Sequence, residues 1–384
     1  MPKVSIMFPS FNHAQYVHEA LSSILKQTFQ DFEVIASDDC STDGTADVIR
    51  SFTDDRIQFH RFEEHAGPTK NHRYCWEHCT GEYIALLNSD DVWLPDHLEK
   101  AVSYLDKHPS CGVVFSWCSE IDENGNTIAP ISDEFRCANH SRAQWLRFFF
   151  THGNCLCHPS MVIRREVYEQ LGFYSETLRQ LPDFDLWIRV VKHFDIHIIQ
   201  EPLVQFRRCS RSMSNTSAPV LINSIRDIAE SQYILSHFFD ALDDKLFAEA
   251  FRPLFVNPEA KSREELLCEK YFLLRNDMYY IPKISLHVAF PVFHEIAKVP
   301  GVLETMKTVY DYSLDDFFEF SGQLDITGIS QLSDESDLIN VLAENPNSPR
   351  NRLKALAWAV FGKNTKAYCF FKKITEKCKF LPII

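Results

Sequence analysis

Short apolar runs alternate with longer stretches of helical periodicity along the N-terminal part of the chain. Runs rich in β-branched and aromatic residues predict strands at 4–8, 32–36, 57–62 and 83–87. Apolar residues that recur every three or four positions predict helices between them, at 16–25, 46–52 and 69–79. Strands and helices that alternate at such short spacing form βαβ units. The pattern therefore indicates an α/β fold with a mostly parallel sheet.

Two of the predicted strands end in adjacent carboxylates, Asp38–Asp39 and Asp90–Asp91. The carboxyl ends of strands in an open α/β sheet line the ligand crevice, so both pairs are expected to face one site. Adjacent carboxylates repel each other, and Mg²⁺ or Mn²⁺ carrying a phosphate-bearing substrate would relieve that repulsion. The alternative for a bare Asp-Asp pair is a solvated turn in which one Asp caps the next helix.

Four motifs extend this interpretation along the chain. The sequence reads PSFN at 9–12, DDCSTDGT at 38–45, GEYIALLNSDDVW at 81–93 and LPDFDLW at 181–187. In this order and at this spacing they resemble the motifs of the family 2 glycosyltransferases. The resemblance covers residues 1 to about 215. It implies the GT-A fold, a Rossmann-like mixed sheet flanked by helices, and an inverting enzyme of the hexosyltransferase type that uses a nucleotide sugar, most plausibly UDP-linked.

The resemblance also implies a set of nucleotide-binding residues. These are Pro9, Phe11, Asn12, Asp38, Asp39, Lys70 and Asp90. Phe11 would pack on the nucleobase, and Asn12 would reach the ribose or a phosphate. Asp39 would accept a hydrogen bond from the base, whereas Asp38 is either a further contact or structural.

The metal ligands implied by the resemblance are Asp91 and Asp90. A bound Mn²⁺ or Mg²⁺ would stabilise the charge that develops on the departing diphosphate. Asn88 stands where the family often has an Asp, which removes one negative charge near the metal.

The resemblance makes Asp183 the general base that takes the proton from the acceptor hydroxyl. Pro182 stands where the family usually has Glu, and loss of a neighbouring carboxylate lowers the pKa of the base, other things being equal. The alternative is that Asp183 and Asp185 cap a helix predicted at 186–193.

Further candidates for acceptor or phosphate contacts follow from the same motifs. They are Trp93, His158, Trp187, Arg207 and Arg211. The aromatic candidates are equally well explained as core residues. Arg207 and Arg211 suit phosphate because guanidinium matches its geometry, although Cys209 stands where the family has His.

Two other functional interpretations remain open from the sequence. A sugar nucleotidyltransferase is also an α/β protein with carboxylate-bound Mg²⁺, but it requires a Gly-rich basic loop after the first strand, which residues 9–12 do not provide. A catalytically inactive scaffold is kept open by Pro182, Asn88 and Cys209. A zinc cluster of His72, Cys75, His78 and Cys79 is disfavoured because it spans two helical turns.

Composition sets the remaining expectations. The chain has 384 residues, a formal net charge of −14 and 45% hydrophobic residues, which suits two domains and argues against nucleic-acid binding. No run of 18 apolar residues occurs, so no transmembrane helix is expected. Twelve scattered cysteines without a signal peptide indicate reduced thiols and a cytoplasmic location.

The domains expected are a glycosyltransferase domain at 1–219 and a mainly helical region at 220–384. Helices are predicted at 222–242, 245–255, 263–274, 302–312 and 338–343, with Pro282, Pro291 and Pro300 at turns or helix ends. This region would shape the acceptor site, form a homodimer or dock to a membrane.

The end of the chain, about 350–384, is basic and amphipathic. Nine Lys and Arg residues stand against Glu376 alone between Arg350 and Lys379. This pattern predicts peripheral contact with an anionic membrane, and the alternative is a terminal helix packed on an acidic body. The membrane interpretation suits a transferase acting on a lipid-linked saccharide at the inner face of the plasma membrane, in synthesis of a bacterial surface polysaccharide such as lipopolysaccharide O-antigen or capsule.

Overall fold

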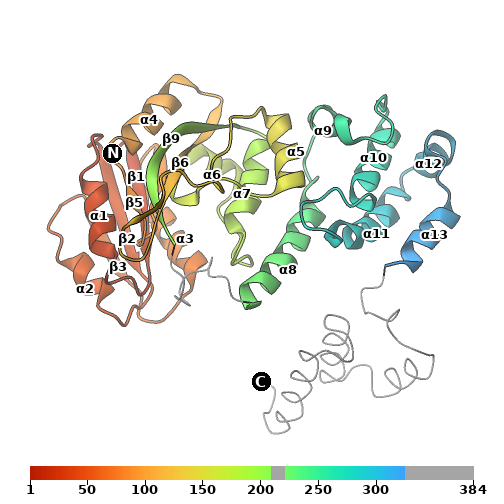
Figure 1. Cartoon of the computed structure of the whole chain (residues 1–384). Helices are drawn as coiled ribbons and strands as arrows, with labels where there is room; N and C mark the ends of the chain where they lie inside the picture. The colour runs from red at the N-terminus through yellow and green to blue at the C-terminus, as the bar shows by residue number, and fades with distance from the viewer. Residues whose placement is uncertain (209–220, 325–384) are drawn as a thin grey trace, which may run out of the picture. The chain divides into compact units, whose positions relative to one another are not determined.

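A computed structural model describes residues 1–208 and 221–324 (Figure 1). The chain divides into two compact units, Met1–Val288 and Ala289–Ile384. Within the described residues, no helix has the length and apolar character that a membrane span requires. The basic segment at 350–384, the helix predicted at 338–343 and Arg211 lie outside the described residues.

The first unit is built on one mixed sheet of nine strands. The strands are β1 Val4–Ser10, β2 Phe32–Asp38, β3 Ile57–Arg61, β4 Tyr83–Leu86, β5 Val92–Trp93, β6 Cys111–Ile121, β7 Thr127–Ala129, β8 Val162–Arg164 and β9 Asp195–Arg207. Their order is β3-β2-β1-β4-β8-β6-β9-β5, with β7 beside β6. The first four strands are parallel to one another, and β8 and β5 run antiparallel to their neighbours. The predicted α/β sheet is thus confirmed, with strand ends within two residues of those expected.

Helices cover both faces of this sheet. They are α1 Val17–Leu25, α2 Thr45–Arg50, α3 Pro68–His78, α4 His97–Lys107, α5 Arg142–His152, α6 Arg165–Leu171 and α7 Pro182–Val191. Figure 1 shows α1 and α3 on opposite faces of the β1–β3 layer. Covered on both sides, β1 and β2 are buried at every position, as parallel strands usually are.

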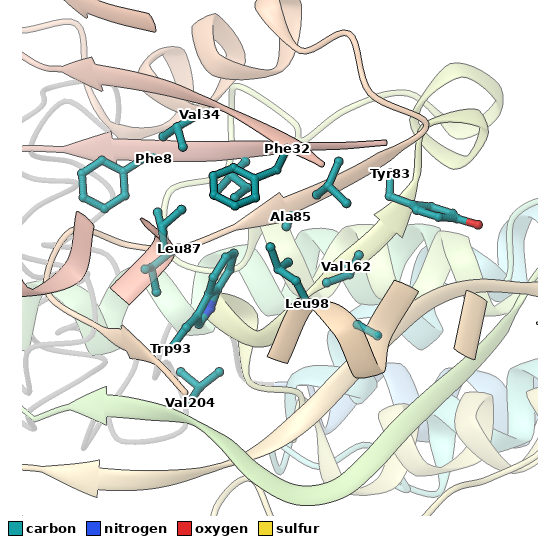
Figure 2. Close-up of a cluster of buried hydrophobic side chains, with 14 of the residues drawn as sticks. Phe8, Phe32, Val34, Tyr83, Ala85, Leu87, Trp93, Leu98, Val162 and Val204 are labelled. Atoms are coloured by element: carbon teal, nitrogen blue, oxygen red, sulfur yellow. The ribbon is translucent and has the colours of Figure 1, made fainter. Parts of the chain in front are cut away.

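The core on one face joins residues of seven strands and three helices, namely β1, β2, β4, β5, β6, β8 and β9 with α1, α2 and α4. Alternate residues Val4, Ile6 and Phe8 of β1 pack with apolar residues of α1 and α4, because side chains on a strand alternate between its faces. Figure 2 shows Phe8, Val34 and Leu87 gathered in this cluster. This packing fixes the register of β1, β2 and β4 and so brings their carboxyl ends to one edge of the sheet.

The remaining helices follow the sheet in sequence. They are α8 Leu221–His237, α9 Asp244–Phe251, α10 Arg263–Arg275, α11 Ile284–Ile296, α12 Val302–Tyr310 and α13 Leu314–Gly322. Helical structure follows the sheet, as expected for the region after residue 219, but the compact unit continues to Val288 and so includes α8, α9 and α10. These three helices are therefore structurally part of the unit that carries the sheet.

Two details of the prediction are wrong. Pro291 lies inside α11 rather than at a helix end. Burial of Ile284, Val288 and Phe293 on this helix, at about 1.5–3 kcal/mol for each side chain, outweighs the roughly 3 kcal/mol that an interior proline costs. The helix expected at 186–193 begins earlier, at Pro182, with Leu181 as its N-cap. Asp183 and Asp185 lie in its first turn and are not its cap.

Candidate active site

A cavity of about 680 Å³ opens at the carboxyl ends of β1, β2 and β4. Its wall includes acidic side chains from three separate motifs, namely Asp39, Asp90, Asp91 and Asp183. The wall also includes residues of α8 and the segment after α10, among them Asp227, Ser231 and Tyr280. Both acidic pairs were predicted to face one crevice. Asp39, Asp90 and Asp91 line the cavity, and Asp38 does not.

Asp39 lines the cavity and is only 1% exposed. Its carboxylate accepts the backbone N–H groups of Ala66 at 2.6 Å and Gly67 at 2.9 Å, and the ring Nδ1 of His65 lies 2.9 Å away. The ring of His65 also lies 4.6 Å from that of Phe11, between centroids. This part of the wall therefore combines an apolar ring surface with a carboxylate, which suits a nucleobase.

Asp38 and Asn12 instead hold the loop that follows β2. Asp38 is fully buried and accepts the backbone N–H of Ser41 at 2.9 Å, with Arg61 Nε at 3.4 Å. Asn12 has a φ of 50° and its Oδ1 accepts the N–H of Thr42 at 3.0 Å. Neither lines the cavity, whereas Pro9 and Phe11 both do.

Asp90 and Asp91 also line the cavity. Asp91 is 2% exposed; its Oδ1 accepts the backbone N–H of Arg207 at 2.8 Å, and its Oδ2 accepts the amide of Asn88 at 3.3 Å. Burial, and then the charge of Asp90, raise the pKa of Asp91 well above its usual range. His13 lies with its Nε2 3.9 Å from Asp90 and its Nδ1 2.8 Å from the hydroxyl of Ser89.

Arg207 supports this acidic pair through hydrogen bonds to both residues. Its buried guanidinium donates to the carbonyl of Asp90 at 2.7 Å, to the carbonyl of Asp122 at 3.0 Å and to the carboxylate of Glu19 at 2.7 Å. It also lies 4.6 Å from the ring centroid of Tyr16. These bonds use three of the five N–H donors of the guanidinium and position the acidic pair; Arg207 also lines the cavity, and its expected phosphate contact stays a prediction.

The acidic pair fits a divalent cation of the Mg²⁺ or Mn²⁺ type. Its donor atoms are carboxylate oxygens, which hard cations prefer, and in the described residues the carboxylate of Asp91 accepts hydrogen bonds from a backbone N–H and a side-chain amide. No group of three or more His, Cys, Asp or Glu side chains in the described residues is arranged to hold a metal. Two carboxylates with oxygens from a diphosphate and water form the usual Mg²⁺ arrangement in such sites.

Asp183 lines the same cavity from the first turn of α7. Its Oδ2 accepts the side-chain amide of Asn154 at 3.1 Å. Burial raises the pKa of Asp183 to about 6, against hydrogen bonds from the backbone of Phe184 and from Asn154 that lower it. A carboxylate with a pKa near neutrality is suited to accept a proton from a hydroxyl group.

Neutral imidazoles border Asp183. Burial lowers the pKa of His72 and of His158 to about 4, so both rings are uncharged at neutral pH. His158 Nε2 lies 2.7 Å from the hydroxyl of Tyr174, and His72 Nδ1 lies 2.7 Å from the carbonyl of Pro68. Predicted His158 therefore does reach the cavity wall, and His72 is a wall residue rather than part of a zinc cluster.

Three other predicted residues lie away from the cavity. Trp93 is buried with its indole N–H donated to the carbonyl of Pro159 at 2.7 Å, and Trp187 is fully buried against Phe115. Both are core residues. Lys70 is exposed on α3 and does not line the cavity.

Sequence reasoning missed several wall residues. His13, His65, Asn154 and Tyr280 carry no motif signal of their own, and only tertiary contacts reveal them. A weak signal existed for His13 and His65, since each lies next to a motif or to the turn that precedes α3. Asn154 and Tyr280 come from segments that the motifs do not reach.

Comparison with known proteins gives a consistent result. Residues 5–172 match the family model described as glycosyl transferase family 2. The uncharacterized glycosyltransferase MJ1057 of Methanocaldococcus jannaschii is 31% identical over 54% of this chain and 71% of its own length. TuaG of Bacillus subtilis, whose name assigns it to teichuronic acid biosynthesis, is 31% identical over 56% of this chain and 82% of its own.

A solved structure with the same fold is that of S. aureus TarS residues 1–349 in complex with UDP-GlcNAc. It is 16% identical, covers 83% of this chain and 89% of its own, and gives a TM-score of 0.54. The GT-A-like mixed sheet followed by a helical region is thereby confirmed.

Proposed function

The chain belongs to glycosyl transferase family 2, and from this premise we propose that it transfers a sugar from a UDP-linked donor to a saccharide or lipid-linked saccharide acceptor. The observation that carries the proposal is one cavity whose wall holds Asp39, Asp90, Asp91 and Asp183. A nucleotide sugar would offer its base, its diphosphate and its anomeric carbon to these groups.

The nucleotide half of the donor would lie next to Asp39. Phe11 and His65 offer ring surfaces to the base, and Asp39 accepts a hydrogen bond from it. UDP is the first nucleotide to test because TarS, which shares the fold, was solved with UDP-GlcNAc.

The diphosphate would lie over the acidic pair. Asp91 and Asp90 would hold Mg²⁺ or Mn²⁺ there, and the ion would supply charge stabilisation for the departing diphosphate. Arg207 keeps the pair in place through its bonds to the Asp91 carboxylate and the Asp90 carbonyl.

Asp183 would serve as general base in a single displacement. It accepts the proton of the acceptor hydroxyl while that oxygen attacks the anomeric carbon, and the diphosphate leaves with the bonding electrons. Attack from the face opposite the leaving group inverts the configuration. With a pKa of about 6, Asp183 is mostly ionised at pH 7, as a base must be.

The setting we propose is the synthesis of a bacterial surface polysaccharide, supported by the similarity to TuaG. Membrane contact through the basic segment at 350–384 and formation of a homodimer stay predictions. Vesicle flotation of the full chain tests the membrane contact, and light scattering of the full chain tests the homodimer.

The test of donor and metal binding is thermal unfolding of the full chain with UDP, GDP, CMP or dTDP, each with and without Mn²⁺. A ligand at about 100 times its Kd stabilises the folded state by about 2.7 kcal/mol, a shift of several degrees in Tm. We expect UDP with Mn²⁺ to produce this shift in the wild type and not in Asp91→Ala. Asp47→Ala, which removes an exposed carboxylate remote from the cavity, is the matched control.

No shift with any of the four nucleotides would refute the proposed donor class. A shift of equal size without Mn²⁺, or one retained in Asp91→Ala, would refute the metal site while leaving the nucleotide site intact.

A further inference from the structure

A buried carboxylate from α8 holds the segment that leads into the helix of Asp183. Glu230 is 7% exposed. Its two oxygens accept three consecutive backbone N–H groups, from Arg179 at 2.9 Å, Gln180 at 2.8 Å and Leu181 at 2.9 Å. The next residue begins α7.

We propose that Glu230 is a positioning residue for glycosyl transfer, which fixes the segment 179–181 and thereby the place of Asp183 in the cavity. The proposal rests on the proposed function of Asp183. Glu230 does not line the cavity itself, so it acts only through the segment that it holds.

The chemistry of the segment explains why a carboxylate is required. Pro182, the first residue of α7, has no N–H group. The N–H groups of residues 179–181 are therefore the last backbone donors before the helix begins. Buried backbone donors need acceptors, and one carboxylate with about four lone-pair sites can serve all three at once. An ionised acceptor also makes stronger hydrogen bonds than a neutral one.

Two other hydrogen bonds also hold the same segment. The hydroxyl of Thr69 on α3 donates to the carbonyl of Leu178 at 3.3 Å, and the guanidinium of Arg226 on α8 donates to the side chain of Gln180 at 3.2 Å. These neutral or partly exposed contacts are weaker than the bonds to Glu230. The position of the segment therefore depends mainly on α8.

The segment 179–181 determines the positions of two residues that line the cavity. Asp183 follows it by two positions, and Arg179 within it lines the cavity. Arg179 and Arg207 are the cavity-lining arginines of the described residues, and Arg179 is the one whose place this segment sets for contact with an anionic group of a substrate. Loosening of the segment would displace both side chains together.

This arrangement lies outside the part of the chain that matches the family model, which ends at residue 172. It links the helical region after the sheet to the segment that precedes Asp183. A role for α8 in turnover would therefore rest on the helical region after the sheet, and truncation before α8 would remove it.

The test compares Glu230→Gln with Glu269→Gln in the full chain. Glu269 is the matched control because it too is a buried helical carboxylate that accepts consecutive backbone N–H groups, from Val256 at 2.8 Å and Asn257 at 2.7 Å, away from the cavity. The probes are UDP release from UDP-GlcNAc, UDP-glucose and UDP-galactose, UDP affinity by calorimetry, and amide hydrogen exchange.

We expect Glu230→Gln to lower kcat by about 10- to 100-fold, because a misplacement of about 1 Å costs this much. Its Kd for UDP should stay within about twofold of wild type, since Asp39 and its contacts are untouched. Amides 179–181 should exchange faster. Glu269→Gln should keep kcat while losing a comparable amount of thermal stability.

Equal kcat values in the two variants would overturn the proposal, as would unchanged exchange at 179–181. If Glu230→Gln does not fold, Glu230→Asp, which keeps the charge but withdraws it by one methylene, should give an intermediate kcat. Failure of the wild type to bind UDP in the calorimetry would refute the proposed function, and the exchange measurement would then still decide whether Glu230 holds the segment.

Discussion

Substitution of Asp183 by Asn should abolish transfer and at the same time stabilise the folded protein. The carboxylate is half-buried on the cavity wall, and burial raises its pKa from the usual 3.8 to about 6. Asn has nearly the same shape and can still accept the amide of Asn154, which now bonds to Asp183 at 3.1 Å. The substitution therefore removes the charge and the base with little change in packing.

The stability effect follows from linkage. Between pH 3.8 and about 6 the folded protein binds more protons at this site than the unfolded chain does, so the wild type loses stability as pH rises. The rise in the pKa of Asp183 from 3.8 to about 6 corresponds to roughly 3 kcal/mol of unfolding free energy. Solvent in the open cavity screens the charge, so we expect about 1–3 kcal/mol at pH 7 and none at pH 3.5.

The catalytic effect should be larger. Loss of a general base typically costs about 10²- to 10⁴-fold in rate. In the wild type, kcat/KM for transfer should rise with pH through an inflection near 6, because the ionised form of Asp183 is the active one. In Asp183→Asn the residual rate should lose this inflection, while UDP affinity stays unchanged.

The assay combines thermal or urea unfolding from pH 3.5 to 8 with transfer rates over the stable part of that range. Asp185→Asn is the control, since Asp185 lies in the same helical turn but pairs with Arg189 at 2.9 Å. Full activity of Asp183→Asn would refute its role as base. A stability difference that does not vary with pH would refute the burial argument for its pKa.

Two further predictions concern the nucleotide site and the support of the acidic pair. Asp39→Asn places an amide donor next to the N–H groups of Ala66 and Gly67, which now donate to the carboxylate. The Kd for UDP, measured by calorimetry, should therefore rise at least about tenfold. An unchanged Kd would exclude Asp39 from the nucleotide site. Arg207→Met leaves the carboxylate of Glu19 and the carbonyl of Asp90 without their donor, so urea unfolding should show a loss of about 3–5 kcal/mol, and a loss below about 1 kcal/mol would contradict its positioning role.

The sequence by itself determined the sheet and the edge where the site lies. Apolar periodicity fixed strands and helices because buried parallel strands and amphipathic helices need these patterns, and short spacing required parallel connections. Acidic motifs after β2 and β4 had to approach each other, since parallel strands bring their carboxyl ends to one edge. Asp39, Asp90 and Asp91 were therefore predictable as neighbours without any coordinates.

Only the tertiary structure decided what each of these side chains does. Asp38 and Asp39 are adjacent, and their division between loop support and cavity depends on the turn after β2 and on the N–H groups of Ala66 and Gly67. The raised pKa of Asp183 results from burial, which is a property of the assembled wall. Glu230 lies about fifty residues after the segment it holds, and no local pattern encodes a contact made by packing across such a separation.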